Sequence, residues 1–293
     1  VRVTSNGVAS DYLSVTSFTI DTIAPTLSTV TIASNNSITT MAKIGDRITL
    51  SITSSEPIQK PSVRIDNQIL PAQQVSEISS GTSWSAYDVM TSNNSEEVVS
   101  LRIDFSDLAD NAGDNVTTTT DGSAVLFDST PPTVSEVTAV PNPTNDNPPD
   151  YTFSSNEAGT ITYGGACGSL SSSSASSVNN NTVYLTQPDN STALIDGTYD
   201  NCTITVTDNA SNTSDNLTVS EFTIGATKPA LAEVTAVPTP DNNTTPSYTF
   251  FSTLSGTINY GGSSCSSSSD NRSVTGEDIN TITFRKPSGG DLD

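Results

Sequence analysis

Short runs of alternating apolar and polar residues recur along the whole chain, with Thr and Ser as the usual polar members. This alternation is typical of half-buried β-strands, whose successive side chains point to opposite faces of a sheet. Turn residues separate the runs at intervals of about eight to twelve residues, without helical periodicity. The pattern therefore predicts an all-β fold of antiparallel sandwiches, with Trp84 in or at the edge of a core. In the first half, strands are predicted over residues 27–32, 47–53, 62–65, 83–90, 98–105 and 124–127.

A longer pattern repeats at a fixed spacing of 97 residues, from Glu136 and Glu233 to Tyr163 and Tyr260. A repeat of this length indicates an array of similar modules. The repeated motifs are Tyr-Thr-Phe at 151–153 and 248–250, Gly-Thr-Ile at 159–161 with Gly-Thr-Ile at 256–258, and Tyr-Gly-Gly at 163–165 and 260–262.

Similar junctions separate the predicted modules. Asp21 and Asp128 each begin a short segment that contains proline, and residues 225–229 are a diverged third copy that begins with Gly225. Proline restricts φ, so we expect stiff linkers and modules stacked end to end as an elongated rod. We predict that 1–21 is the last two strands of an incomplete module, that 22–128 and 129–225 are complete modules, and that 226–293 lacks its last strands.

The two ends of the chain together amount to roughly one module, which leaves two explanations open. Strands in residues 1–20 of one subunit could complete residues 226–293 of the next, so that the chain polymerises head to tail by donor-strand complementation. Alternatively, the 293 residues are a section of a longer tandem array. Cys265 favours the second explanation, because the position of its expected partner falls between the two ends.

Composition narrows the classes of function. The chain has 32 acidic and 10 basic residues and a net charge of −22. This charge argues against binding to nucleic acid or anionic membranes and makes divalent cations the natural counter-charge. Histidine, the usual general base, is absent, and no carboxylate pair stands out as catalytic, so we expect no enzymatic activity. No apolar run approaches the roughly 20 residues that span a bilayer, so we expect no membrane insertion.

The three cysteines predict one disulfide. Cys167 and Cys202 fall in one predicted module, on its third and sixth strands or the adjoining loops, and are expected to pair. Cys265 is the repeat equivalent of Cys167 and is expected to be unpaired in this chain. A disulfide is typical of exported proteins, whereas the alternative, two buried free thiols, would fit a cytosolic chain.

Acidic and amide side chains supply the only candidate ligand sites. Asp104, Asp107, Asp110 and Asn111 place hard oxygen donors at the close spacing that calcium requires. Asp21 and Asp128 could clamp neighbouring modules by sharing an ion, whereas Gly225 offers no ligand at the third junction. The alternative is plain turn chemistry, because Asp, Asn and Gly are also ordinary turn residues.

The chain resembles the bacterial Ig-like domains that repeat in tandem in large extracellular adhesins and surface filament proteins. One module subtype carries Ala-Lys-Ile-Gly-Asp at 42–46, Gly-Thr-Ser-Trp at 81–84 and Phe-Ser-Asp-Leu-Ala-Asp-Asn-Ala-Gly at 105–113, and the other carries the repeated motifs given above. The resemblance implies tandem immunoglobulin-like β-sandwiches and a location at the cell surface, and it carries over no catalytic residue. In calcium-stiffened relatives acids at the junctions bind the ion, and Asp21 and Asp128 match in position.

From these features we expect a structural or adhesive segment of an extracellular protein, acting as a stiff spacer. Its expected partners are neighbouring modules or copies of itself in a filament. A second alternative, besides donor-strand polymerisation, is a module that binds glycans or other proteins. The shortage of clustered aromatic residues argues against that alternative.

Overall fold

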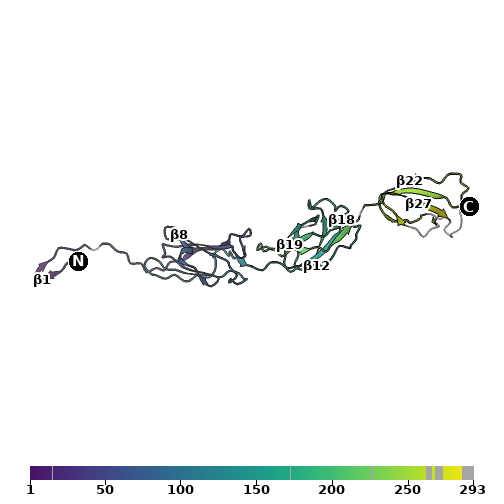
Figure 1. Ribbon diagram of the computed structural model, residues 1–293. Coiled ribbons are helices and arrows are strands. Elements are labelled where there is room, and N and C mark those ends of the chain that lie inside the picture. Colours follow the sequence, from purple (N-terminus) through teal and green to yellow (C-terminus); the bar gives the residue numbers. More distant parts are fainter. Residues whose placement is uncertain (15, 172, 226, 262–265, 268–272, 286–293) are drawn as a thin grey trace. The chain divides into compact units, whose positions relative to one another are not determined.

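The computed structural model describes the chain except for residues 15, 172, 226, 262–265, 268–272 and 286–293. Strands make up its regular structure (Figure 1), and the described residues also contain one short 3-10 helix, η1 (Ala72–Gln74). Within the described ranges, no helix has the length and apolar character needed to cross a membrane. The chain divides into two compact units. Unit 1 comprises Val1–Ala139, Asp150–Thr192 and Asn201–Ser220, and unit 2 comprises Val140–Pro149, Ala193–Asp200 and Glu221–Asp293.

Unit 1 contains an N-terminal hairpin and the strands of two sandwiches. The hairpin is formed by β1 (Thr4–Ser5) and β2 (Val8–Ala9). The first sandwich contains β3 (Leu27–Ser34), β4 (Met41–Ala42), β5 (Arg47–Ser54), β6 (Ser62–Ile65), β7 (Gln68–Ile69), β8 (Val75–Ser79), β9 (Ser83–Val89), β10 (Leu101–Asp104) and β11 (Leu126–Phe127). The middle sandwich contains β12 (Val134–Thr138), β13 (Asp150–Ser155), β14 (Gly159–Gly164), β15 (Gly168–Ser169), β16 (Ser174–Ala175), β17 (Asn181–Thr186), β19 (Thr203–Thr207) and β20 (Leu217–Thr218).

The two sandwiches share one sheet arrangement. The first has a four-stranded sheet in the order β3-β5-β9-β8, and the middle one has the order β12-β13-β17-β15. In each, the first strand pairs with the second, the second pairs with a later strand, and a short strand covers the far edge. This is the A-B-E-D sheet of immunoglobulin-like domains. The facing sheets have the orders β10-β6-β7 and β16-β14-β19-β20, and β11 pairs in parallel with β4.

Alternation along the strands builds the core of the first sandwich. On β5, Ile48, Leu50 and Ile52 are at most 1% exposed, whereas the residues between them are not buried. Ile103 on β10 is also fully buried, so both sheets contribute apolar side chains. The expected place of Trp84 is confirmed. It is 6% exposed, and its indole Nε1 donates a hydrogen bond to the Gly81 carbonyl at 3.0 Å.

Two of the repeated glycines permit a close approach between β14 and the chain around β19. A Cβ at Gly159 would overlap the carbonyl oxygen of Thr207. A Cβ at Gly165, whose φ is +71°, would overlap the carbonyl oxygen of Asn201. Glycine is therefore required at both positions, by contact at the first and by contact and backbone conformation at the second.

Unit 2 contains a two-stranded sheet in which β18 (Gly197–Tyr199) pairs with β21 (Phe222–Ile224). Its four-stranded sheet has the order β22-β23-β27-β25, which matches the A-B-E-D arrangement of unit 1. Gly256–Thr257 pairs with Ser273–Val274 in a further two-stranded sheet, β24-β26. The strands of the four-stranded sheet are β22 (Leu231–Thr235), β23 (Ser247–Ser252), β25 (Ser266–Ser267) and β27 (Asp278–Arg285).

The predicted strands of the first half are all present, with ends that differ by at most three residues. Within residues 1–21, where two strands were expected, the described residues contain the two short strands of the hairpin, β1 and β2. Leu13, Phe18 and Ile20 are 72–77% exposed, and Leu13 exchanges backbone hydrogen bonds with Val1 at 2.8 and 2.7 Å. The module boundaries stay a prediction.

Truncating a core residue tests this arrangement. We expect Leu50→Ala to lower the free energy of unfolding by about 2–5 kcal/mol, because it removes buried methyl groups and leaves a cavity. Urea denaturation measures the loss, and Leu108→Ala is the control, since Leu108 is 72% exposed. A change of less than about 0.5 kcal/mol in Leu50→Ala would contradict the position of the core.

Candidate functional site

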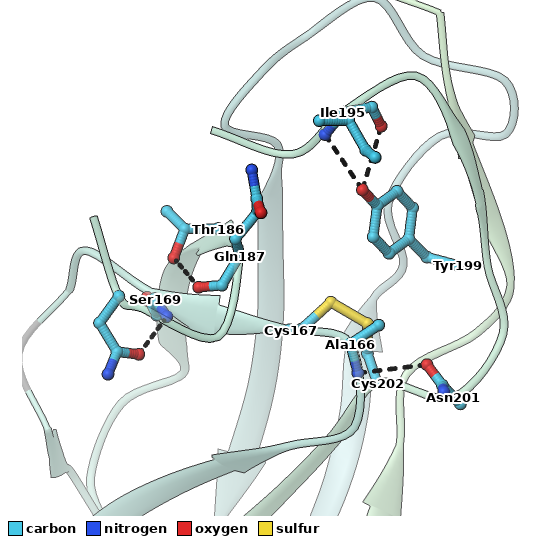
Figure 2. Close-up of a disulfide and its surroundings, with 10 residues drawn as sticks. Ala166, Cys167, Ser169, Thr186, Gln187, Ile195, Tyr199, Asn201 and Cys202 are labelled. Carbon is cyan, nitrogen blue, oxygen red and sulfur yellow. Dashed lines mark hydrogen bonds between the residues drawn. A yellow bond between two sulfur atoms is a disulfide. The ribbon is translucent and has the colours of Figure 1, made fainter. Parts of the chain in front are cut away.

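The predicted disulfide is present in unit 1. Cys167 follows β14 and Cys202 directly precedes β19, two strands that pair up to Gly164 and Thr203. The Cα atoms of the two cysteines are 5.1 Å apart, and both side chains are buried. Figure 2 shows the bridge and, beside it, the hydrogen bond of 3.2 Å from the Ala166 N–H to Asn201 Oδ1. The bridge closes the end of the β14-β19 pair, and Cys265 lies outside the described residues.

In unit 2 a tyrosine fixes the backbone upstream of itself. The Tyr199 hydroxyl donates to the Ile195 carbonyl at 3.0 Å and accepts from the Ile195 N–H at 3.1 Å (Figure 2). A tyrosine shortly before the second cysteine, bonded to the backbone a few residues upstream, is a hallmark of immunoglobulin-like sandwiches. This bond supports the fold class independently of the sheet order.

Two groups of three carboxylates stand out in unit 1. The first acidic cluster is Asp21, Glu56 and Asp107, and the second is Asp128, Glu157 and Asp208. Within each cluster, one carboxylate oxygen from each residue lies within 4.8 Å of the other two. Each cluster draws one residue from a predicted junction, one from the turn after the second strand of a four-stranded sheet (β5 or β13), and one from the loop after β10 or β19. The two clusters are therefore equivalent sites.

The same hydrogen bonds build both clusters. The Asn111 side-chain amide donates to the Asp21 carbonyl at 3.1 Å and to Asp107 Oδ2 at 2.7 Å. The Asn212 amide donates to the Asp128 carbonyl at 3.0 Å and to Asp208 Oδ2 at 3.0 Å. In both loops the asparagine follows the aspartate by four residues. One asparagine thus ties the last residue before a junction to the loop of the sandwich that follows it.

The glutamate of each cluster sits in a turn that does not need it. The Ser54 hydroxyl donates to the Glu56 carbonyl at 2.6 Å, and the Ser155 hydroxyl donates to the Glu157 carbonyl at 2.6 Å. In unit 2 the same turn is closed from the Ser252 hydroxyl to the Leu254 carbonyl at 2.7 Å. The third copy therefore keeps the turn but replaces the glutamate by leucine. Gly225 replaces the junction aspartate, so this copy lacks two of the three carboxylates.

The second cluster holds negative charge that its surroundings do not neutralise. Burial raises the pKa of Asp128, and the negative charges of Asp208 and Glu96 also raise it. A hydrogen bond from the Thr130 N–H lowers the pKa but does not cancel these effects. Burial also raises the pKa of Glu157, with added contributions from Asp128 and Asp208. In the first cluster the side-chain hydrogen bond from Asn111 lowers the pKa of Asp107.

A fourth acid holds the linker after Asp128. Glu96 Oε1 accepts hydrogen bonds from the Ser129 N–H at 2.9 Å, the Ser129 hydroxyl at 2.6 Å and the Thr130 hydroxyl at 2.7 Å. These bonds lower the pKa of Glu96. The linker is therefore bonded on both sides, through Asn212 to the loop after β19 and through Glu96 to the first sandwich.

The structure brings some of the predicted calcium ligands together and gives others different partners. It brings Asp21 and Asp107 together and places Asp128 in the second cluster. Asn111 contributes its amide, whereas Asp104 forms an ion pair of 2.7 Å with Arg102, and Asp110 accepts a hydrogen bond of 2.6 Å from Gln59. Sequence reasoning missed Glu56, Glu157 and Asp208. The shared Asp-x-x-x-Asn spacing at 107–111 and 208–212 could have identified Asp208.

The donor set of each cluster fits a hard divalent cation such as calcium. Calcium takes six to eight oxygen ligands from carboxylates, carbonyls and water, and three convergent carboxylates supply the charge that attracts it. Cysteine and histidine, which zinc prefers, are absent from both clusters. Three carboxylates without a cation repel one another, so any bound cation would act by tying a junction residue to the following sandwich.

Comparisons with known proteins identify no family. No protein-family model matches the chain, and no curated protein matches it. Among solved structures, the chain is similar to a three-domain immunoglobulin segment of titin in a variant with glutamate-to-alanine substitutions. The match covers 91% of this chain and 89% of that chain, with 10% sequence identity and a TM-score of 0.36. So low a score carries no argument, and the fold class rests on the sheet order and on the Tyr199 bond.

Thiol labelling tests the disulfide. Without reduction we expect one labelled thiol per chain, at Cys265, and after reduction three, as measured by intact mass. Reduction is expected to lower the free energy of unfolding by about 4 kcal/mol, because the bridge closes a loop with a sequence separation of 35 residues. Three labelled thiols before reduction would contradict the pairing.

The raised pKa of Glu157 predicts a pH-dependent effect of its removal. A raised pKa means that folding disfavours the charged form, so ionised Glu157 destabilises the protein at neutral pH in the absence of a cation. This penalty is lost as the pH falls through the raised pKa, where the carboxyl is protonated. In chelator, Glu157→Gln should therefore raise the melting temperature at pH 7, and the difference should vanish below about pH 4.

Differential scanning calorimetry measures this effect. Glu221→Gln is the matched control, because it removes an exposed carboxylate outside both clusters. A melting temperature that falls in Glu157→Gln at pH 7 in chelator would mean that the carboxylate stabilises the fold by itself.

Proposed function

We propose that the chain is a structural segment of an extracellular cell-surface protein or filament, in which tandem Ig-like modules act as a stiff spacer. Its partners are the neighbouring modules of the same protein or other copies in a filament. No catalytic step is involved. The segment resists bending and extension through sheet hydrogen bonds, the buried disulfide and bonded junctions.

The observation that carries this proposal is the hydrogen bond that recurs at two junctions. Asn111 binds the carbonyl of Asp21, and Asn212 binds the carbonyl of Asp128, each from the loop of the sandwich that follows. A flexible linker would leave these carbonyls to water, because a chain without fixed geometry gains nothing from a directed bond. Repetition of the bond supports a selected, regular junction.

Further bonds at the second junction support stiffness. The Asn36 side chain, 8% exposed, donates to the Ala210 carbonyl at 2.8 Å and to Asp46 Oδ2 at 2.7 Å. Asn36 belongs to predicted module 22–128 and Ala210 to predicted module 129–225. A buried amide with both donated bonds satisfied is costly to expose, because it would lose directed bonds that water only partly replaces.

A calcium ion at each acidic cluster would add to this stiffness. It would bind Asp21, Glu56 and Asp107 at the first junction and Asp128, Glu157 and Asp208 at the second. The third junction would stay without an ion, since Gly225 and Leu254 provide no side-chain ligand. The spacer would then combine calcium-dependent junctions with one that is calcium-independent.

Small-angle X-ray scattering on the 293-residue chain tests the proposal. We expect a radius of gyration well above the about 19 Å of a compact protein of this length, because end-to-end modules do not collapse on one another. Calcium should raise the melting temperature and narrow the distribution of lengths relative to chelator. Glu157→Gln should reduce this response, and Asp215→Asn, exposed and outside both clusters, should leave it unchanged.

Each part of the proposal has its own contrary result. A radius of gyration near about 19 Å would contradict the proposal that the chain is an extended spacer. A melting temperature unaffected by calcium would contradict the calcium sites, but it would not contradict the hydrogen-bonded junctions. Filaments that grow with the concentration of this chain alone would favour the donor-strand alternative.

A further inference from the structure

Two arginines lie side by side on the outer face of the β10-β6-β7 sheet. Arg64 on β6 is directly opposite Arg102 on β10 in the antiparallel register. Like charges in this position repel and destabilise a strand pair. Only 10 residues of the chain are basic, against 32 acidic ones, so the pairing of two arginines is not a consequence of composition.

The fold does not require charge at this place. In the middle sandwich the corresponding strands β14 and β19 pair from Thr160 and Thr207 to Gly164 and Thr203 without any charged residue. Opposed threonines such as Thr162 and Thr205 are favourable neighbours on a sheet. The arginine pair is therefore an addition to a sheet that forms without it.

Arg64 is distinguished from the other basic residues of the first sandwich by its bonding. Its Nε is buried and has no hydrogen-bond partner within the described part of the chain. The other four are engaged: Lys43 with Asp46 at 3.7 Å, Arg47 over the Tyr87 ring at 4.1 Å, Lys60 with the Ala72 carbonyl at 2.8 Å, and Arg102 with Asp104 at 2.7 Å. Since Arg64 is only half-buried, a ligand would reach the two terminal nitrogens of its guanidinium rather than the buried Nε.

The arginines line a pocket of about 500 Å³. The remaining polar side chains around it are Asn67, Ser100, Asp104 and Thr117. Its volume is sufficient for a ligand of the size of a monosaccharide, and its hydroxyl and amide groups can both donate to and accept from ligand hydroxyls.

The charge balance selects the ligand. Asp104 occupies the Nε and Nη2 donors of Arg102, so the pocket contains two positive charges and one negative charge. The net charge of +1 matches the single negative charge of a carboxylate, whereas a phosphate monoester brings about −1.5 to −2 and exceeds it. The planar fork of an arginine also matches the two oxygens of a carboxylate.

We propose that this pocket binds a sugar acid, with Arg64 holding its carboxylate and Asn67, Ser100 and Thr117 bonding its hydroxyls. The site is distinct from both acidic clusters and gives the first sandwich a ligand of its own, beyond the role of a spacer. An arginine replaces the aromatic platform on which many saccharide sites depend, which reconciles carbohydrate recognition with a chain poor in aromatic residues.

Titration of the full chain with glucuronate, followed by NMR or calorimetry, tests this site. We expect saturable binding with a dissociation constant of about 1–10 mM at physiological salt. Arg64→Gln should weaken it at least tenfold without lowering the melting temperature, because the substitution also removes the repulsion from Arg102. Lys60→Gln is the matched control and should bind as the native chain does.

Neutral glucose and inorganic phosphate distinguish the possible ligands. Both should bind much more weakly than glucuronate. Equal binding of glucose would show that the carboxylate is irrelevant, and tighter binding of phosphate would show a general anion site; either result overturns the proposal. If Arg64→Gln does not fold, Arg64→Lys decides: it retains the charge but loses the fork, so unaltered glucuronate binding in that variant would also overturn it.

Discussion

The whole structure depends on the burial of one face of each strand in a chain that is only 33% hydrophobic. With so few apolar residues, a sandwich forms only where nearly every second position of a strand reaches the core. Ile48, Leu50 and Ile52 on β5 show this economy, since each is almost fully buried between non-buried polar neighbours. A shift of register by one residue would expose all three at once, so the pattern fixes the register of the sheet as well as the strands.

The acidic clusters are not needed to bury the apolar faces of the strands. The turn after the second strand is closed by a serine hydroxyl whether the residue two positions on is Glu56, Glu157 or Leu254. Glutamate is thus not needed for the turn, and its placement beside two aspartates raises electrostatic cost. Such a cost is tolerated where the groups serve something other than stability. In this chain the three carboxylates converge where the linkers meet the sandwiches, which ties the cost to the junction.

Much of the fold could be predicted from the sequence, because alternation and the 97-residue repeat are local or periodic signals. The pairing of Cys167 with Cys202 was likewise predictable, since both fall in one predicted module. The composition of the clusters was not. Asp104 and Asp110 lie near Asp107 in the sequence, yet Asp104 projects from a strand toward Arg102 and Asp110 contacts Gln59. Glu56 and Asp107 are 51 residues apart and meet only because two loops close at the same end of a sandwich.

Comparison between copies within the chain separates structural residues from added ones. A side chain at Gly159 or Gly165 would collide with the chain around β19, so these two positions serve packing in the middle sandwich. Glu157 gives way to Leu254 without loss of the turn, and the charged pair of Arg64 and Arg102 has only neutral counterparts between β14 and β19. Where the residue type differs between copies but the local backbone geometry is the same, folding does not require that particular residue. The acids at two junctions and the arginines on one sheet are such positions, and the chemistry of this chain is therefore to be sought there.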